Sequence, residues 1–190
     1  ALSSDMPRVR REVAAALGRI GAKANSAVPK LSEQLAIEED EMVRDQLLVT
    51  LAELGPAAGQ AVPTIVGLLN DDNTANRYTA AFALGKIGPD AKPAIPELRR
   101  NLRESDRFLR LVSAWALVQI EPDDSDIGRE AAPILRTGLD QVRVQVINAL
   151  AETGRTDPLV MRALRKAAKS DDENVRKAAQ DALKKLKPEK

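Results

Sequence analysis

The chain of 190 residues contains no cysteine and no histidine, and only 2% of its residues are aromatic. Without these two residue types it has no disulfide, no thiol nucleophile, no Ser-His-Asp triad and none of the usual zinc, haem or iron–sulfur ligand sets. Most familiar enzyme chemistry is thereby excluded. The lack of cysteine leaves the compartment open, because reducing and oxidising environments both tolerate it.

Long apolar runs are also missing. No stretch of 18 apolar residues occurs, and there is neither a secretory-type leader nor a lipidation signal, so we expect no part of the chain to span or anchor to a membrane. Hydrophobic residues nevertheless make up 44% of the chain. With so few aromatics, this composition predicts a core of Ala, Leu, Val and Ile, which is typical of closely packed helices.

An arginine and a leucine recur along the chain at almost fixed spacing. The arginines are Arg10, Arg44, Arg77, Arg110, Arg143 and Arg176, at intervals of 34, 33, 33, 33 and 33 residues. Each is followed seven residues later by a leucine: Leu17, Leu51, Leu84, Leu117, Leu150 and Leu183. A period of this length predicts a solenoid, in which each unit buries its apolar face against the next.

Two helices are predicted in each repeat. In the second repeat an arginine helix covers residues 42–54 and a proline helix covers residues 61–70, with a proline near its start. Glycine after the arginine helix permits a left-handed cap, and acid before it can cap the free N–H groups. The prolines are Pro29, Pro63 and Pro96, the glycines Gly21, Gly55, Gly88 and Gly154, and the acids Asp5, Asp40, Asp72, Asp106, Asp140 and Asp172.

The fourth repeat and the two ends depart from this pattern. Glu121 replaces the capping glycine and Pro133 falls four residues late, which predicts a longer or bent connection. The chain begins in mid-repeat and its last helix is polar, so we expect the C-terminal part of a longer array. The whole chain is interpreted as one domain, with repeats near 6–40, 41–72, 73–106, 107–140 and 141–172 and a cap at 173–190.

The arginine helices and their glycines resemble a known repeat family. Segments 9–21 and 81–88 are similar to HEAT repeats of the phycobilisome-lyase-like subtype, and the resemblance covers essentially the whole chain. It implies an all-α fold, a right-handed α-solenoid of about five and a half helical hairpins. It says little about function, because one fold serves many activities.

Activities found among HEAT-like proteins were compared with these residues. The iron-dependent hydroxylases of this class need His-Glu pairs, which a chain without histidine cannot supply. Bilin lyases are not eliminated, but no residue marks a bilin pocket. HEAT-like DNA glycosylases use several tryptophans on a basic surface, whereas this chain has only Trp115 and a net charge of +1. We therefore predict no enzyme activity, no catalytic residue, no cofactor and no metal site.

One stripe of the arginine helices is predicted to face a partner. On a helical wheel it lies opposite the buried stripe, and by resemblance to HEAT-like proteins it lines the concave groove. All four aromatic residues lie at or beside it, and apolar neighbours extend a patch larger than a monomer usually exposes. The predicted groove residues are Met42, Val49, Tyr78, Phe82, Phe108, Leu111, Val112, Trp115 and Val144. Packing between repeats is the alternative interpretation.

Charge is less informative. Residues 1–95 carry a net charge of −2 and residues 96–190 one of +3, which is too even for a typical nucleic-acid-binding protein. A basic cluster near the C-terminus could meet phosphate or an acidic protein, although a solvated face explains it as well: Arg162, Arg165, Lys166, Lys169, Arg176, Lys177, Lys184, Lys185 and Lys187. The six periodic arginines are predicted to form charge-assisted hydrogen bonds between repeats.

These observations favour a non-enzymatic, monomeric scaffold that binds a protein or peptide in its concave groove. A nucleic-acid-binding or DNA-repair module is the main alternative, and a structural spacer within a larger protein is another.

Overall fold

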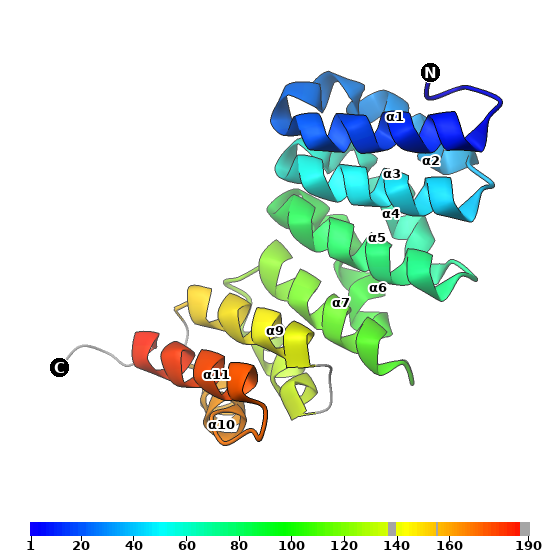
Figure 1. Cartoon of the computed structure of the whole chain (residues 1–190). Helices are drawn as coiled ribbons and strands as arrows, with labels where there is room; N and C mark the ends of the chain where they lie inside the picture. Colours follow the sequence, from blue (N-terminus) through cyan, green and yellow to red (C-terminus); the bar gives the residue numbers. More distant parts are fainter. Residues whose placement is uncertain (137–139, 155, 187–190) are drawn as a thin grey trace. The chain divides into compact units, whose positions relative to one another are not determined.

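A computed structural model describes residues 1–136, 140–154 and 156–186 (Figure 1). All regular structure within these ranges is helical. The predicted all-α solenoid is therefore confirmed, with paired helices following one another along the chain. The chain forms two compact units, unit 1 (Ala1–Glu97) and unit 2 (Leu98–Lys190), and the division falls within one helix.

The arginine helices are the long helices of the structure. In unit 1 they are α1 (Pro7–Ile20), α3 (Glu41–Leu54) and α5 (Thr74–Ile87), which are stacked side by side in Figure 1. In unit 2 they are α7 (Arg107–Ile120), α9 (Asp140–Glu152) and α11 (Glu173–Lys185). The helix predicted over 42–54 is thus confirmed within one residue.

Acidic capping holds for some of these helices and fails for others. The carboxylates of Asp40, Asp106 and Asp172 accept hydrogen bonds from the first turns of α3, α7 and α11. The prediction for Asp72 is wrong, because α5 begins one residue later and Asn73 is its cap. Asp5 does not cap α1 either, since α1 begins after Met6 without a side-chain cap. Both aspartate and asparagine can cap a helix, so residue type alone does not show whether Asp72 or Asn73 is the cap of α5.

Three of the four predicted glycines directly follow their arginine helices, but not in the predicted conformation. Gly21, Gly55 and Gly88 have φ values of 64°, 59° and 75° with ψ values of −141°, −133° and −137°. These values lie outside the left-handed helical region, in a region that is almost confined to glycine. In the first three repeats the glycine opens a seven-residue 3₁₀ segment: η1 (Gly21–Ala27), η2 (Gly55–Ala61) and η4 (Gly88–Ala94).

Gly21→Ala is predicted to lower the free energy of unfolding by about 1–3 kcal/mol, because alanine is strained at this φ and ψ. No other group lies within 4 Å of the position that a Cβ at residue 21 would take, so the effect reports the backbone alone. Gly67→Ala is the matched control. That site is equally open, but its φ is −56°, so we expect stabilisation by about 0.4–1 kcal/mol. Urea unfolding measures both, and equal effects would contradict the explanation.

The proline helices are shorter, and in the first three repeats each follows a 3₁₀ segment. They are α2 (Val28–Ile37), α4 (Val62–Gly67) with its 3₁₀ extension η3 (Leu68–Asn70), α6 (Ile95–Asn101) and α10 (Pro158–Ala167). The fourth repeat, for which a longer or bent connection was predicted, inverts this order. There α8 (Ser125–Ala131) comes first and the 3₁₀ segment η5 (Ala132–Arg136) follows it. Glu121, which has no positive φ, stands where the other repeats have glycine.

The core is aliphatic, as the composition predicted. Leu51, Leu84, Leu117 and Leu150 of the periodic set are buried, with exposures of 0–2%. Leu17 in the first repeat and Leu183 in the last are only half-buried. In the part of the chain that the structure describes, no helix is long and apolar enough to cross a membrane.

Candidate functional site

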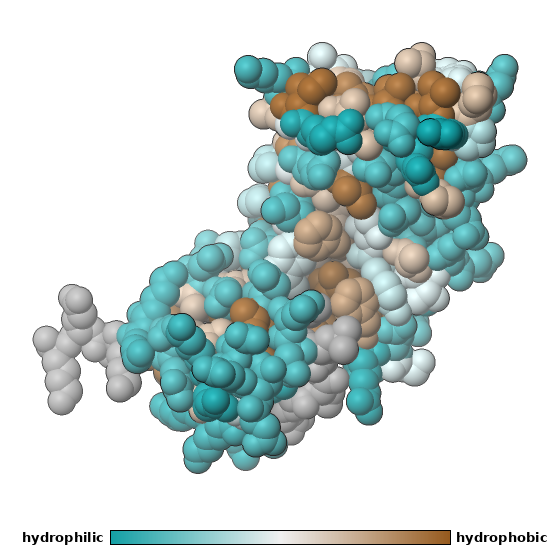
Figure 2. Space-filling model, in the orientation of Figure 1, coloured by the Kyte–Doolittle hydropathy of each residue, from teal (hydrophilic) through white to brown (hydrophobic). Residues whose placement is uncertain are grey.

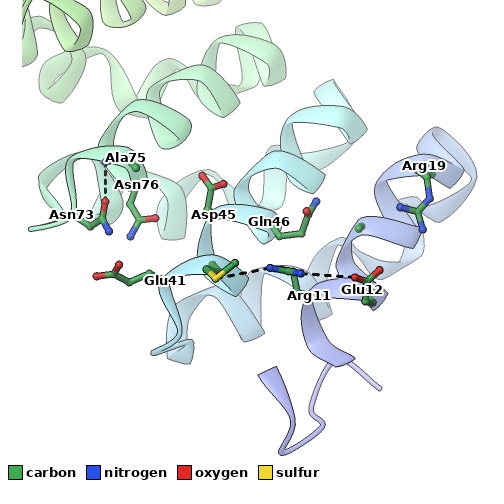
Figure 3. Close-up of a pocket in the computed structure, with 11 residues that line it drawn as sticks. Arg11, Glu12, Arg19, Glu41, Asp45, Gln46, Asn73, Ala75 and Asn76 are labelled. Atoms are coloured by element: carbon green, nitrogen blue, oxygen red, sulfur yellow. Dashed lines mark hydrogen bonds and ion pairs between the residues drawn. The ribbon is translucent and has the colours of Figure 1, made fainter. Parts of the chain in front are cut away.

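The candidate site lies within unit 1, on the faces of α1, α3 and α5 that point away from the proline helices. A hollow of about 540 Å³ lies across these three helices. Figure 3 shows residues from all three helices arranged around it. It is lined by Arg11, Glu12, Ala15, Arg19, Glu41, Met42, Asp45, Gln46, Asn73, Ala75 and Asn76.

Charges of both signs surround this hollow. Arg11 lies between two neighbours: its Nη1 is 3.9 Å from the sulfur of Met42 and its Nη2 is 4.0 Å from a carboxylate oxygen of Glu12. Asp45 accepts a hydrogen bond of 2.7 Å from the hydroxyl of Thr79. Within the described ranges the side chains of Arg19, Glu41 and Gln46 make no such interaction. These three side chains therefore have hydrogen-bonding groups that no described residue uses.

Apolar side chains lie on the same helix faces. Met42 on α3 is 63% exposed and Phe82 on α5 is 42% exposed, which is unusual for side chains of this size. Val49 and Tyr78, also on α3 and α5, are half-buried. Figure 2 shows brown, hydrophobic atoms among teal ones over this part of unit 1. The face thus combines apolar and charged groups. We call Met42, Val49, Tyr78, Phe82 and the lining of the hollow the unit 1 groove.

The other predicted groove residues belong to unit 2. Phe108 and Val144 are half-buried there, whereas Leu111, Val112 and Trp115 are buried. Trp115 has an exposure of 9%. These three side chains therefore expose little surface in this structure, and a role for them in partner binding remains a prediction.

The polar lining of the hollow was not predicted from the sequence. Arg11, Glu12, Asp45 and Gln46 occur at helical spacing beside the predicted stripe, so the same wheel that selected Met42 would have placed them on its edge. They were missed because charged residues on a helix surface are common and carry no distinguishing pattern. Only the packing of three helices shows that these side chains surround one hollow.

The six periodic arginines share one structural role. Each donates a hydrogen bond to a backbone carbonyl six or eight residues before it, in the segment that leads into its own helix. The acceptors are the carbonyls of Ser4, Glu38, Leu69, Glu104, Leu135 and Ser170, for Arg10, Arg44, Arg77, Arg110, Arg143 and Arg176 respectively. Each arginine therefore holds the segment that precedes its helix against the first turns of that helix.

Two of these arginines also pair with an acid in the turn that leads into the next arginine helix. Arg10 binds Glu38 through two hydrogen bonds, of 2.7 Å from Nε and 2.6 Å from Nη2. Arg44 binds Asp71 at 2.7 Å. By the repeat bounds 6–40 and 41–72 each pair lies within one repeat, so these charge-assisted bonds join an arginine helix to the end of its own repeat rather than to another repeat. They give both arginines a structural role.

Glu38 is the most perturbed acid among these groups. Its side chain is only 1% exposed. Hydrogen bonds from Arg10 are the main cause that lowers its pKa from 4.5 to about 2, against the opposing effect of burial, and bonds from Gln34 and from the Asp40 N–H add to the lowering. An acid that is ionised at all physiological pH values and fully bonded within the protein serves to hold the loop, not to transfer protons.

Comparison with known families decides what kind of repeat this is. A model of HEAT repeats matches residues 28–118, and a model of the PBS lyase HEAT-like repeat matches residues 9–36. The chain is a HEAT-repeat protein. The resemblance to the PBS-lyase-like subtype that the sequence suggested is thereby confirmed. No curated protein matches this HEAT-repeat chain in sequence.

Solved structures with this fold include engineered proteins and designed armadillo repeat proteins. An engineered protein of the Northeast Structural Genomics Consortium is 21% identical with a TM-score of 0.72, over 98% of this chain and 95% of that one. A designed armadillo repeat protein is 17% identical with a TM-score of 0.67, over 98% and 97%. Another, in complex with the peptide (KR)4, is 16% identical with a TM-score of 0.55, over 95% and 92%. At these identities the likeness shows the fold alone.

Proposed function

We propose that this HEAT-repeat protein is a non-enzymatic interaction scaffold that binds a peptide or helical segment of another protein in the unit 1 groove. The observation that carries the proposal is the exposure of Met42 and Phe82 on the faces that also form the hollow. Large exposed apolar side chains rimmed by polar groups are typical of protein interaction sites.

The chemistry of the groove supports a peptide rather than a small metabolite. The hollow is lined mainly by flexible charged and amide side chains, and it is open along three helices. Small-molecule sites are usually enclosed and mostly apolar, with few polar groups. An extended or helical peptide, by contrast, can place apolar anchors at Met42 and Phe82 and satisfy Glu41 and Gln46 with its polar groups. Peptide binding by a designed armadillo neighbour agrees with such use of the fold.

The test begins with selection of peptides from a displayed random library on the immobilised chain. The affinity of a selected peptide is then measured for the wild type and for a Met42→Ser, Phe82→Ser double variant. We expect the double variant to bind at least about tenfold more weakly, because apolar anchors supply most of the energy at such sites. Both side chains are exposed, so the melting temperature should change little.

Ile37→Ser is the control for this experiment. Ile37 is 74% exposed on α2, outside the groove, so its replacement removes an exposed apolar side chain elsewhere. Its affinity for the peptide should remain within about twofold of the wild type. Equal losses in both variants, or no selected peptide at all, would argue against the proposed function and in favour of a structural spacer.

A further inference from the structure

A second groove lies in unit 2, between the 3₁₀ segment η5 and helix α10. It has a volume of about 300 Å³. It is lined by Arg129, Ala132, Pro133, Leu159, Arg162, Ala163 and Lys166. Apolar side chains and three cations thus share one small groove, without an acidic residue in its lining.

One face of α10 supplies most of this lining. Leu159, Arg162, Ala163 and Lys166 follow the spacing of a single helical face, while Val160, Leu164 and Ala167 form the buried face. Leu159 is 52% exposed. The groove therefore contains an apolar contact that water covers in the free protein.

The cations of this groove are not all neutralised. Arg129 donates a hydrogen bond of 2.8 Å to Asp157, so its charge is compensated. Arg162 and Lys166 have no ion-pair or hydrogen-bond partner among the residues that the structure describes. They stand four residues apart on one helix, where two like charges repel each other. An anion placed between them would relieve this repulsion.

The repeat architecture does not require cations at this place. The corresponding groove of unit 1, between α2 and α4, has a volume of about 500 Å³ and contains no charged residue: Leu35, Ala36, Pro63, Thr64, Gly67 and Leu68 line it. Two neighbouring hairpins can thus pack with an uncharged groove between their proline helices. The cations of the unit 2 groove are therefore not a general requirement for packing two such helices together.

From these features we propose that the groove between η5 and α10 binds an acidic segment of a partner protein, with an apolar side chain against Leu159 and carboxylates at Arg162 and Lys166. Charge complementarity selects the acidic partner, and the apolar floor selects a protein segment over a nucleic acid. This site is separate from the unit 1 groove, and its test does not depend on the proposed function.

The experiment measures binding of a fluorescein-labelled peptide of about four helical turns, carrying Glu and Leu at helical spacing. Two comparison ligands are measured in the same way: the same peptide with Gln in place of Glu, and a single-stranded DNA with the same net charge as the acidic peptide. We expect the acidic peptide to bind the full chain at least about tenfold more tightly than its Gln counterpart. Arg162→Glu with Lys166→Glu should weaken binding at least about tenfold, and Leu159→Ser about threefold or more.

A matched control separates this groove from the general charge of unit 2. Lys177→Glu with Lys185→Glu makes the same change of charge on α11, outside the groove, and should alter the affinity by less than about threefold. An equal loss in the control pair would overturn the proposal, since net charge would then explain the binding. Tighter binding of the DNA than of the peptide, an unchanged affinity in Leu159→Ser, or no binding of the acidic peptide would overturn it as well.

Discussion

Replacing Glu38 with glutamine is expected to lower the free energy of unfolding at pH 7 by about 3 kcal/mol. The value follows from the pKa of Glu38, which folding lowers from 4.5 to about 2. Each pKa unit of this lowering corresponds to about 1.4 kcal/mol of folding free energy. Glutamine cannot offer Arg10 two charged acceptor oxygens. Urea unfolding of both proteins at pH 7 measures the difference.

The same substitution has a defined pH dependence. A folded-state pKa below the unfolded one means that ionised Glu38 contributes its full stabilisation above about pH 4.5, and that this contribution is lost as the pH falls toward 2. The gap in stability between the wild type and Glu38→Gln should therefore narrow over this range. A gap that stays constant from pH 7 to pH 2 would show that the charge of Glu38 is not its source.

Glu33→Gln provides the control, because it makes the same chemical change in an exposed ion pair. Glu33 lies 3.0 Å from Lys30 on α2, and the side chains are 66% and 58% exposed. Exposed pairs of this kind contribute about 0–1 kcal/mol. We expect Glu33→Gln to change the unfolding free energy at pH 7 by less than about 1 kcal/mol. If Glu33→Gln lowered the unfolding free energy as much as Glu38→Gln, burial and pairing with Arg10 would not explain the effect at Glu38.

The second large effect is expected at the periodic leucines. Leu84→Ala should destabilise the protein by about 2–5 kcal/mol, because Leu84 on α5 is fully buried and its truncation leaves a cavity. The equivalent truncation Leu17→Ala in α1 should cost less than half as much, since Leu17 is only half-buried. Urea unfolding of the two variants gives the comparison, and equal costs would contradict the idea that neighbouring repeats cover this position.

Much of the fold could be predicted because the repeat imposes the same physical demands six times. The period of the arginines and leucines predicted the long helices, and the prolines predicted the starts of α2, α4 and α6. The seven-residue 3₁₀ segments were not predicted. They depend on the φ and ψ of a single glycine, such as Gly55, and a sequence shows that a glycine is present but not which of its allowed conformations it adopts.

The candidate site could be predicted only where a helix is amphipathic. On α3 and α5 the wheel correctly placed Met42 and Phe82 on an exposed face. On α7 ten of fourteen residues are buried, so this helix has scarcely any exposed face and Trp115 lies within it. A helix that is apolar on all sides is typically buried, so the composition of α7 could have predicted that Trp115 is buried. The charged lining of the hollow required the packing of α1, α3 and α5 to be known.

The bonds between hairpins have a consequence for how such a chain can evolve. Arg10 reaches Glu38 and Arg44 reaches Asp71 at the end of the same repeat, and Thr79 reaches Asp45 in the preceding repeat, across 28, 27 and 34 residues respectively. In unit 2, Arg129 reaches Asp157 across 28 residues. Because these contacts extend no further than one repeat, duplicating or deleting a stretch of one period would rebuild the same bonds at the new junction. Gene duplication could therefore lengthen the protein without first inventing a new interface.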